Sequence, residues 1–171
     1  TRDRIYGECE WLNRRFMLID TGGIEPKTDD PIFKYMRLQT ELAIEMADVV
    51  VFITDVTVGV TADDREVARM LQRSGKPVIP AVNKVDGVGT MPPEFYEFYE
   101  LGLGEPYAVS SVHGSGTGDL LDAVLEKLPE GAGEEEEDDS IKVAVIGKPN
   151  AGKSSIINKI VGQERLIVSN I

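Results

Sequence analysis

The sequence has 171 residues, of which 42% are hydrophobic, and its formal net charge is −12 at pH 7. Its length suits one α/β domain with a sizeable core. The acidic balance looks unfavourable for binding to nucleic acid, but seven of the acidic residues lie in one run, and without them the net charge is −5. The single cysteine, Cys9, excludes an internal disulfide. No segment has the length and apolarity of a signal peptide or a membrane span, so we expect a cytoplasmic protein with no membrane partner.

Short apolar runs alternate with stretches of helical period along the first 128 residues. Apolar and polar residues alternate from Ile5 to Trp11, which predicts an edge strand. Thr61 followed by Asp64 predicts an N-cap pair for a helix. The alternation of strand-like and helix-like segments predicts a parallel sheet covered by helices. Further strands are expected at 16–19, 49–53, 78–82 and 107–109, and helices at 32–47, 62–73 and 119–128.

An acidic run, EGAGEEEEDD at 130–139, holds much of the negative charge. Its composition is typical of a solvated, self-repelling linker. A segment that mimics nucleic acid is the functional alternative. We place the clear boundary of the chain here, which divides it into residues 1–129, 130–140 and 141–171.

The apolar stretch 141–146 leads into the run GKPNAGKS and then into a helix-like stretch. A strand, a glycine-rich loop and a helix in this order are typical of a phosphate-binding loop. The glycines allow N–H groups to face phosphate oxygens, the helix adds its positive end, Lys153 adds a charge and Ser154 can bind Mg²⁺. A plain glycine-rich turn is the alternative. The residues of the predicted loop are Gly147, Lys148, Pro149, Asn150, Ala151, Gly152, Lys153 and Ser154.

Polar or glycine residues follow three other predicted strands, and in an open parallel sheet such loops converge where ligands bind. Asp20 can hold Mg²⁺ through water, and the N–H of Gly23 can reach a terminal phosphate. The Asp86 carboxylate can accept hydrogen bonds from the N1–H and N2–H₂ edge of guanine, which adenine lacks. Ordinary turns are the alternative for each loop. The loops contain Asp20, Thr21, Gly22 and Gly23; Asn83, Lys84, Val85 and Asp86; and Ser110, Ser111, Val112, His113 and Gly114.

Together these motifs resemble those of the Der (EngA) family of translation-factor-class GTPases. The resemblance rests on the loops above and on TRDRIYG at 1–7, EWLN at 10–13, LIDTGGI at 18–24 and GEPY at 104–107. That family has two tandem GTPase domains followed by an RNA-binding KH-like domain. The resemblance implies that residues 1–129 are the first domain without its phosphate loop. Residues 130–140 would be the interdomain linker, and 141–171 the start of the second domain.

The resemblance implies a P-loop NTPase fold, with three α/β layers and a mostly parallel sheet. It also implies GTP binding and hydrolysis, and a parent protein that acts in assembly of the large ribosomal subunit. Residues 147–154 would bind the phosphates and Mg²⁺, while Asp20 and Gly23 would sense the terminal phosphate. The residues implied to hold guanine are Asn83, Lys84, Val85, Asp86, Ser110, Ser111 and Val112.

Three further roles follow from the resemblance alone. Thr1 would be the switch threonine that ligates Mg²⁺ in the GTP state. Ile24 stands where many GTPases have a water-orienting glutamine, and an aliphatic side chain cannot orient water. A K⁺ ion bound partly by Asn150 would then supply positive charge to the reaction. On spacing alone, Asn150 is equally well interpreted as a turn residue.

We hypothesise that strand 141–146 fills the central position of the first domain's sheet, because an empty position would expose two apolar strand edges. The chain would then close as a circularly permuted GTPase domain. Natural permuted GTPases generally begin at the base-recognition motif, so we favour a truncated product of a longer protein. Two other functions compete: a non-catalytic fragment that binds GDP or GTP weakly or only packs against a partner, and an ATP-dependent kinase, which Asp86 disfavours.

Two further features invite functional interpretations. The aromatic residues at 95–99 could stack on RNA bases, but without basic neighbours we interpret them as packing for a short helix. His113 is the single histidine. Because GTPase chemistry depends on positioning and charge stabilisation, we do not assign it a role as general base.

Overall fold

The computed structural model describes residues 5–21, 31–87, 90–129 and 141–161 of the chain. Within these ranges, six strands form one sheet in the order β1-β2-β6-β3-β4-β5. The strands are β1 (Ile5–Trp11), β2 (Arg14–Asp20), β3 (Val49–Asp55), β4 (Val78–Asn83), β5 (Tyr107–Ala108) and β6 (Ile141–Gly147). The helices are α1 (Pro31–Met46), α2 (Ala62–Ser74), α3 (Thr117–Lys127), α4 (Lys153–Val161) and the 3-10 helix η1 (Pro93–Leu101).

The last strand of the sequence lies in the middle of the sheet. β6 pairs in parallel with β2 on one side and with β3 on the other. The parallel pairing continues from β3 to β4 and from β4 to β5. β1 is antiparallel to β2 and forms an edge, which confirms the edge strand predicted at 5–11. The sheet is open, with β1 and β5 at its two edges.

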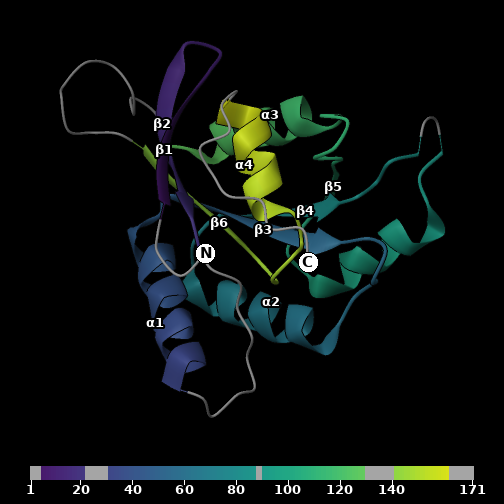
Figure 1. Cartoon of the computed structure of the whole chain (residues 1–171), viewed down its shortest axis with the longest axis horizontal. Helices are drawn as coiled ribbons and strands as arrows, with labels where there is room; N and C mark the ends of the chain where they lie inside the picture. Colours follow the sequence, from purple (N-terminus) through teal and green to yellow (C-terminus); the bar gives the residue numbers. More distant parts are fainter. Residues whose placement is uncertain (1–4, 22–30, 88–89, 130–140, 162–171) are drawn as a thin grey trace.

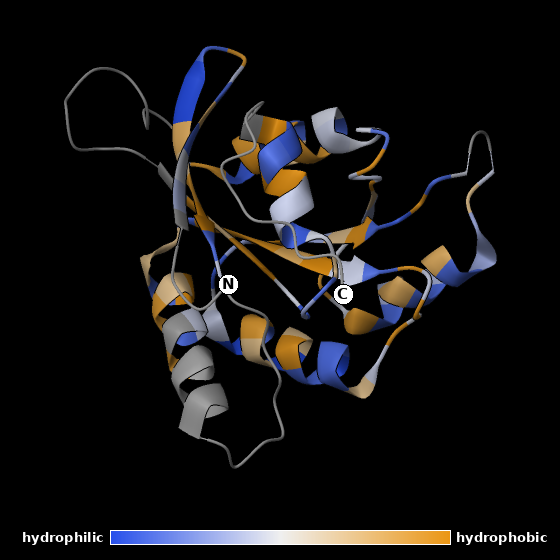
Figure 2. Cartoon of the chain, viewed as in Figure 1, coloured by the Kyte–Doolittle hydropathy of each residue, from blue (hydrophilic) through white to orange (hydrophobic). Residues whose placement is uncertain are grey.

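Helices cover both faces of the sheet and give three layers, with α3 and α4 on one face and α1, α2 and η1 on the other (Figure 1). Along β3, Val49, Val51 and Ile53 belong to the apolar cluster under α3 and α4. Val50 and Phe52 belong to the cluster under α1, α2 and η1. Hydrophobic residues accordingly dominate the central strands (Figure 2). These layers confirm the predicted α/β fold class, and burial on both faces explains the continuous apolar runs.

The ends of α2 follow from its local sequence. The Thr61 hydroxyl accepts a hydrogen bond from the Asp64 backbone N–H at 3.2 Å, and the Asp64 carboxylate accepts one from the Thr61 N–H at 2.9 Å. This reciprocal capping box confirms the predicted N-cap pair. The helix ends at Gly75, whose φ of 68° lies in the left-handed region that favours glycine.

The aromatic residues between β4 and β5 lie in η1, and only half of them pack as predicted. Phe95 and Phe98 are buried, which confirms the packing interpretation for this pair. Tyr96 and Tyr99 are 60% and 46% exposed. Because a 3-10 helix has three residues per turn, positions 95 and 98 share one face, and positions 96 and 99 share another.

Among the described residues, no helix is long and apolar enough to cross a membrane. The predicted linker at 130–140 lies outside the described residues, so the division of the chain into three segments stays a prediction. The structure does show which strands neighbour β6: Val143 pairs with Leu18 of β2 and with Val49 of β3.

Candidate functional site

The parallel strands bring several predicted loops to one edge of the sheet. β2 ends at Asp20, β4 at Asn83 and β6 at Gly147, and Ser110 follows β5 closely. Loops after parallel strands meet at the carboxyl edge of the sheet, where ligands bind in open α/β folds. Side chains from the loops after β2, β4 and β5 contact one another or the loop after β6, as described next.

The loop between β6 and α4 has the tight course expected of a phosphate-binding loop. A Cβ on Gly147 would lie 2.3 Å from the carbonyl oxygen of Ile53, so only glycine allows β6 to run this close to β3. Asn150 and Gly152 have φ values of 64° and 88°. The Ala151 N–H bonds to the Lys148 carbonyl at 3.2 Å, which closes the turn before α4 begins.

Asn83 joins the loop after β6 to the loop after β5. Its side chain is fully buried, and its amide group donates to the Ala151 carbonyl at 2.8 Å. Its amide oxygen accepts the Ser111 N–H at 3.1 Å. A Cβ on Gly152 would lie 2.1 Å from the Asn83 amide nitrogen, so the contact also requires glycine in the phosphate loop. The structure therefore gives Asn83 a tethering role, which the sequence pattern does not reveal.

Lys153 opens α4 and is buried, with 7% of its surface exposed. Its ammonium group donates to the carbonyl of Lys148 in its own loop at 2.7 Å. Burial lowers the pKa of Lys153 from 10.5 to about 8, although the nearby Asp20 carboxylate acts in the opposite direction. Among the described residues, the one hydrogen-bond acceptor of this buried cation is a neutral carbonyl, which an anionic ligand would outcompete.

Asp20 and Ser154 meet beside Lys153. The Ser154 hydroxyl donates to Asp20 Oδ2 at 3.1 Å, and Asp20 is 1% exposed. Within the described part of the chain, Asp20 Oδ1 is the one buried side-chain polar atom without a hydrogen-bond partner. Burial raises the pKa of Asp20, against the attraction of Lys153 and the bond from Ser154. Thr21 next to it donates to the Val145 carbonyl at 2.9 Å, which ties this loop to β6.

The Asp20 and Ser154 oxygens fit a magnesium ion. Mg²⁺ prefers oxygen ligands and usually takes one or two from the protein, with the rest from water and phosphate. A buried carboxylate with one oxygen unpaired, 3.1 Å from a serine hydroxyl, offers such a partial set. The described residues contain no group of three or more His, Cys, Asp or Glu that could enclose a metal ion by themselves.

The loops after β4 and β5 form the other side of the site. The Ser110 hydroxyl, which is fully buried, donates to Asp86 Oδ1 at 2.5 Å. The Val85 N–H bonds to the Val109 carbonyl at 3.1 Å, so the two loops run together. The bond from Ser110 fixes the orientation of the Asp86 carboxylate and leaves its second oxygen available to a ligand. Val112 is 75% exposed at the tip of the neighbouring turn.

One residue of this side was missed in the sequence. Asp55 ends β3 and forms an ion pair with Lys84 at 2.6 Å between Oδ2 and Nζ. Its Oδ1 accepts the N–H and the hydroxyl of Thr57 at 2.9 and 2.7 Å. Burial acts to raise the pKa of Asp55, but these contacts outweigh it and the pKa is lowered. The sequence did contain a signal for Asp55: it stands at the end of a buried strand, which is also where the other predicted site loops begin.

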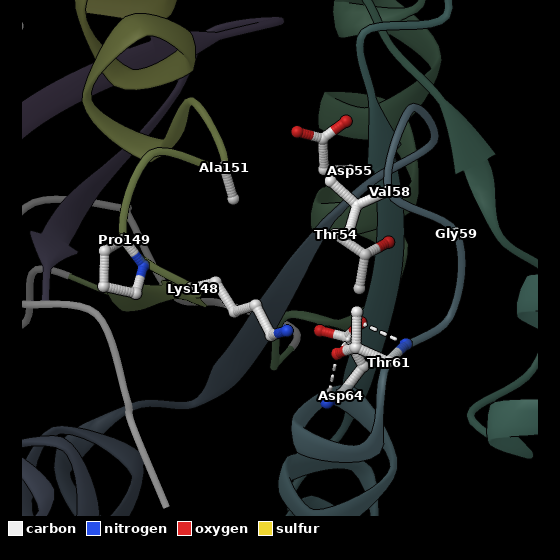
Figure 3. A pocket seen from close by; sticks show the side chains of 9 residues that line it. All are labelled: Thr54, Asp55, Val58, Gly59, Thr61, Asp64, Lys148, Pro149 and Ala151. Atoms are coloured by element: carbon white, nitrogen blue, oxygen red, sulfur yellow. Dashed lines mark hydrogen bonds between the residues drawn. The ribbon is translucent and has the colours of Figure 1, made fainter. Parts of the chain in front are cut away.

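A small cavity of about 50 Å³ lies between the phosphate loop and the loop from β3 to α2 (Figure 3). Lys148 reaches across it toward the start of α2, and its ammonium group lies 3.6 Å from Asp63. The volume suits water and is far below that of a nucleotide pocket. It is lined by Thr54, Asp55, Val58, Gly59, Thr61, Asp64, Lys148, Pro149 and Ala151.

Four predicted site residues cannot be placed. Thr1, Gly22, Gly23 and Ile24 lie outside the described residues. The structure brings together the other parts of the prediction: the phosphate loop, Asp20, and the loops that begin at Asn83 and Ser110.

A parallel sheet between helices, with a phosphate-binding loop and an aspartate on the neighbouring strand, defines a P-loop nucleotide-binding fold. The family described as 50S ribosome-binding GTPase matches residues 1–84 and 142–171, and the chain belongs to this family. Over all 171 residues it is 62% identical to GTPase Der from Ruminiclostridium cellulolyticum and 59% identical to GTPase Der from Acetivibrio thermocellus. These matches confirm the Der resemblance. The chain spans 39% of the length of each relative.

Solved structures of Era share the fold. Era from Aquifex aeolicus bound to GDP·AlF4⁻ has a TM-score of 0.69 and 30% identity, over 81% of this chain and 48% of the Era chain. Era in complex with MgGDPNP and nucleotides 1506–1542 of 16S ribosomal RNA gives the same TM-score at 31% identity and the same coverage. GTPase homologues thus bind guanine nucleotides with magnesium at this fold.

Proposed function

We propose that this chain binds GDP and GTP with Mg²⁺ at the carboxyl edge of its sheet, and that the parent protein hydrolyses GTP. The observation that carries the proposal is the contact of Asn83 with Ala151 and Ser111, which joins a phosphate loop to a base-side loop. A site that could hold both ends of one nucleotide requires this proximity. The similarity to GTPase Der and to Era supports guanine as the base.

On the phosphate side, Lys153 would exchange the Lys148 carbonyl for phosphate oxygens, which replaces a bond to a neutral acceptor with one in which both partners are charged. The N–H groups of residues 147–154 and the positive end of α4 would add to the attraction. Asp20 and Ser154 would hold Mg²⁺, and Thr1 would join them in the GTP state. When bound, the ion supplies positive charge to the phosphate oxygens during transfer.

On the base side, Asp86 would choose guanine. Its carboxylate is anchored by Ser110 and can accept both donors on the Watson–Crick edge of guanine. Adenine offers a carboxylate only one donor there, and would leave one acceptor of the site unpaired. Lys84 and Asn83 would support the base and the loop around it. Ser111 would close the site over the base together with the exposed turn that includes Val112.

Hydrolysis would need groups that orient the terminal phosphate and stabilise its charge. The Gly23 N–H would contact that phosphate. Because Ile24 cannot orient water, a K⁺ ion held partly by Asn150 would supply the additional positive charge. If these groups do not assemble in the isolated chain, the alternative is a fragment that binds GDP or GTP without turnover or only packs against a partner.

The cellular role follows from similarity and rests on the parent protein. We propose assembly of the large ribosomal subunit in the cytoplasm, supported by the family description as a 50S ribosome-binding GTPase. Residues 1–129 would belong to the first GTPase domain, 130–140 to a linker and 141–171 to the start of a second domain. In this chain, β6 would complete the sheet of the first domain and give a permuted arrangement.

The test is a titration of the 171-residue chain with fluorescent GDP in Mg²⁺, first in K⁺ and then in Na⁺. GTP should displace the probe and ATP should not. Release of phosphate from GTP in a single turnover then separates hydrolysis from binding. Equal displacement by ATP, or the absence of binding, would overturn the proposal. Guanine-selective binding without turnover would support the non-catalytic alternative for the isolated chain.

A further inference from the structure

The 3-10 helix η1 presents a surface that the nucleotide site does not use. It spans nine residues, whereas 3-10 helices rarely exceed four. Its sequence after Pro93 repeats every three residues, as Glu-Phe-Tyr, Glu-Phe-Tyr and Glu-Leu. Because three residues complete one turn, each residue type forms a row along the helix. The rows are Phe95, Phe98 and Leu101; Tyr96 and Tyr99; and Glu94, Glu97 and Glu100.

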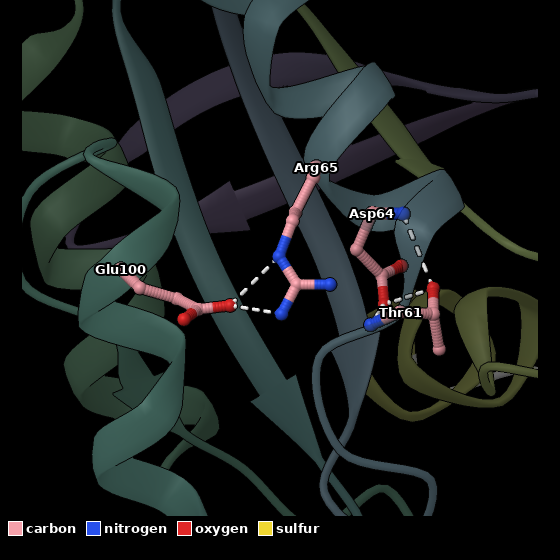
Figure 4. A network of polar contacts seen from close by, with 4 residues as sticks. All are labelled: Thr61, Asp64, Arg65 and Glu100. Carbon is pink, nitrogen blue, oxygen red and sulfur yellow. Dashed lines mark hydrogen bonds and ion pairs between the residues drawn. The ribbon is translucent and has the colours of Figure 1, made fainter.

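The apolar row fixes η1 on the body of the protein. Phe95, Phe98 and Leu101 are each at most 4% exposed and belong to the cluster shared with α2. Gln72 of α2 donates to the Leu101 carbonyl at 3.0 Å. Arg65 of α2 forms an ion pair with Glu100 at 2.6 Å (Figure 4). These contacts with α2 hold η1 in place, so the tyrosine and glutamate rows keep fixed positions on the surface.

The two tyrosines are exposed but ordered by a buried neighbour. The ring of Phe95 makes edge contacts with Tyr96, at 5.8 Å and 82°, and with Tyr99, at 6.5 Å and 85°. Such aromatic pairs contribute favourable energy in addition to that gained from the apolar area that they bury. Because the two rings are already held in place, less side-chain conformational entropy is lost when a partner binds. Tyrosine is also enriched among the residues that dominate interface energies.

The segment that contains this helix carries charge of one sign, although Arg65 of the neighbouring α2 pairs with Glu100. From Asp86 to Glu105 the sequence has five acidic residues and no lysine or arginine. Glu94 and Glu97 are exposed on the same helix as the tyrosines. This surface repels a phosphate backbone and attracts cations, and a cation over an exposed aromatic ring is stabilised by its π face.

We propose that the tyrosine and glutamate rows of η1 dock a basic, extended polypeptide segment of another protein. Each row repeats once per turn, about every 6 Å. Alternate residues on one face of an extended chain lie about 6.7 Å apart. Lysine or arginine at every second position would therefore meet Tyr96, Tyr99 and the glutamates beside them in succession. The complementary charge would also speed the encounter.

The test uses a fluorescein-labelled twelve-residue peptide of alternating arginine and serine, titrated with the full chain and followed by anisotropy. The paired substitutions Tyr96→Ala and Tyr99→Ala should weaken binding at least about fivefold. Glu97→Gln should weaken it about two- to fivefold. Matched controls are Tyr6→Ala on β1, which also removes an exposed tyrosine, and Glu126→Gln on α3, which removes the same charge.

The acidic run at 130–139 could also attract the peptide, but it is unchanged in all variants. Weakening by the η1 substitutions and none by the controls would thus assign binding to η1. Equal weakening by the controls, no peptide binding, or tighter binding of a single-stranded RNA of equal length through the same tyrosines would overturn the proposal. Fluorescent GDP binding by the same samples shows separately whether the nucleotide site is intact.

Discussion

The two sides of the site differ in how far the protein completes them by itself. On the base side, Asp86 accepts the Ser110 hydroxyl at 2.5 Å, and both ends of the Asn83 amide are bonded. On the phosphate side, Asp20 Oδ1 has no partner among the described residues, and the buried Lys153 ammonium donates to a neutral carbonyl.

The pKa shifts of two aspartates at strand ends reflect this difference between the two sides. Asp20 ends β2 and Asp55 ends β3. Burial raises the pKa of Asp20, whereas the bonds from Lys84 and Thr57 outweigh burial and lower the pKa of Asp55. Asp20 is more deeply buried and has fewer partners than Asp55, and these two differences, not residue type, separate their pKa values. The loops of the base side are therefore joined within the protein itself, whereas the phosphate side has polar groups that a ligand would pair.

The largest expected effect is on the phosphate side. Lys153→Ala should weaken GDP binding roughly 100-fold, about 3 kcal/mol, because a charge-assisted bond to phosphate is lost. Titration with fluorescent GDP measures this. Lys159→Ala removes an exposed lysine from the same helix and should leave affinity unchanged. Similar losses in both variants would mean that general charge, and not the buried lysine, attracts the nucleotide.

On the base side, Asp86→Asn should change specificity. Asparagine presents one donor and one acceptor, so the two donors of guanine are no longer matched and GDP affinity should fall about 50-fold, ~2.3 kcal/mol. Xanthosine diphosphate, whose C2 carbonyl accepts a hydrogen bond, should gain in competition against GDP. Asp119→Asn on α3 is the charge-matched control. Unchanged preference between the two nucleotides would remove Asp86 from the base site.

The convergence of the site loops could be predicted from the sequence, because parallel strands bring the loops that follow them to one edge of the sheet. The phosphate loop, Asp20 and Asp86 were proposed as site residues because each residue type suits a part of a nucleotide or its metal ion, and the structure places them at the same edge of the sheet. Asp55 was not, because its partner Lys84 lies 29 positions away and only the pairing of β3 with β4 brings them together. The tethering role of Asn83 depends likewise on β6 lying beside β3.

Local geometry limited the prediction for η1 as well. Aromatic residues in a short run look alike in sequence, and an α-helical period would not separate Phe95 from Tyr96 cleanly. The three-residue turn of a 3-10 helix does separate them, and it buries one pair while exposing the other.

Removing the base-side tether should destabilise the fold. Asn83→Ala leaves the buried Ala151 carbonyl and the half-buried Ser111 N–H without their partner, which should lower the free energy of unfolding by about 2 kcal/mol. Urea unfolding without nucleotide measures the loss. Ser111→Ala removes only a 3.4 Å contact with the Asn83 amide and should cost less than about 0.5 kcal/mol. Equal effects would show that the loops are not joined through Asn83.

The smallest expected effects are those of Asp20→Asn and Asp55→Asn on the free energy of unfolding. They have opposite signs, and they test most directly whether the two sides of the site differ. Asp20 has a raised pKa in the fold, so its ionised form is disfavoured there. Ionised Asp20 therefore destabilises the fold, and this destabilisation becomes smaller as pH falls through the folded pKa. Asp55 has a lowered pKa, so it contributes stability above its unfolded pKa and loses it as pH falls through the folded pKa. At pH 7 without nucleotide, Asp55→Asn should lower the unfolding free energy by about 1 kcal/mol, and Asp20→Asn should raise it by about 0.5 kcal/mol.

Urea unfolding of both variants at pH 7 and at pH 3, on either side of the ordinary aspartate pKa of 3.8, gives the comparison, with Asp119→Asn as the exposed control. Mg²⁺ and GDP should then stabilise the Asp55→Asn protein strongly and the Asp20→Asn protein weakly, because only the second variant lacks the carboxylate that the metal ion would bind. A loss of stability in both variants without ligand would mean that the phosphate side is as complete as the base side. Asp20 would then be a structural residue, because its ionised carboxylate would already be stabilised within the protein.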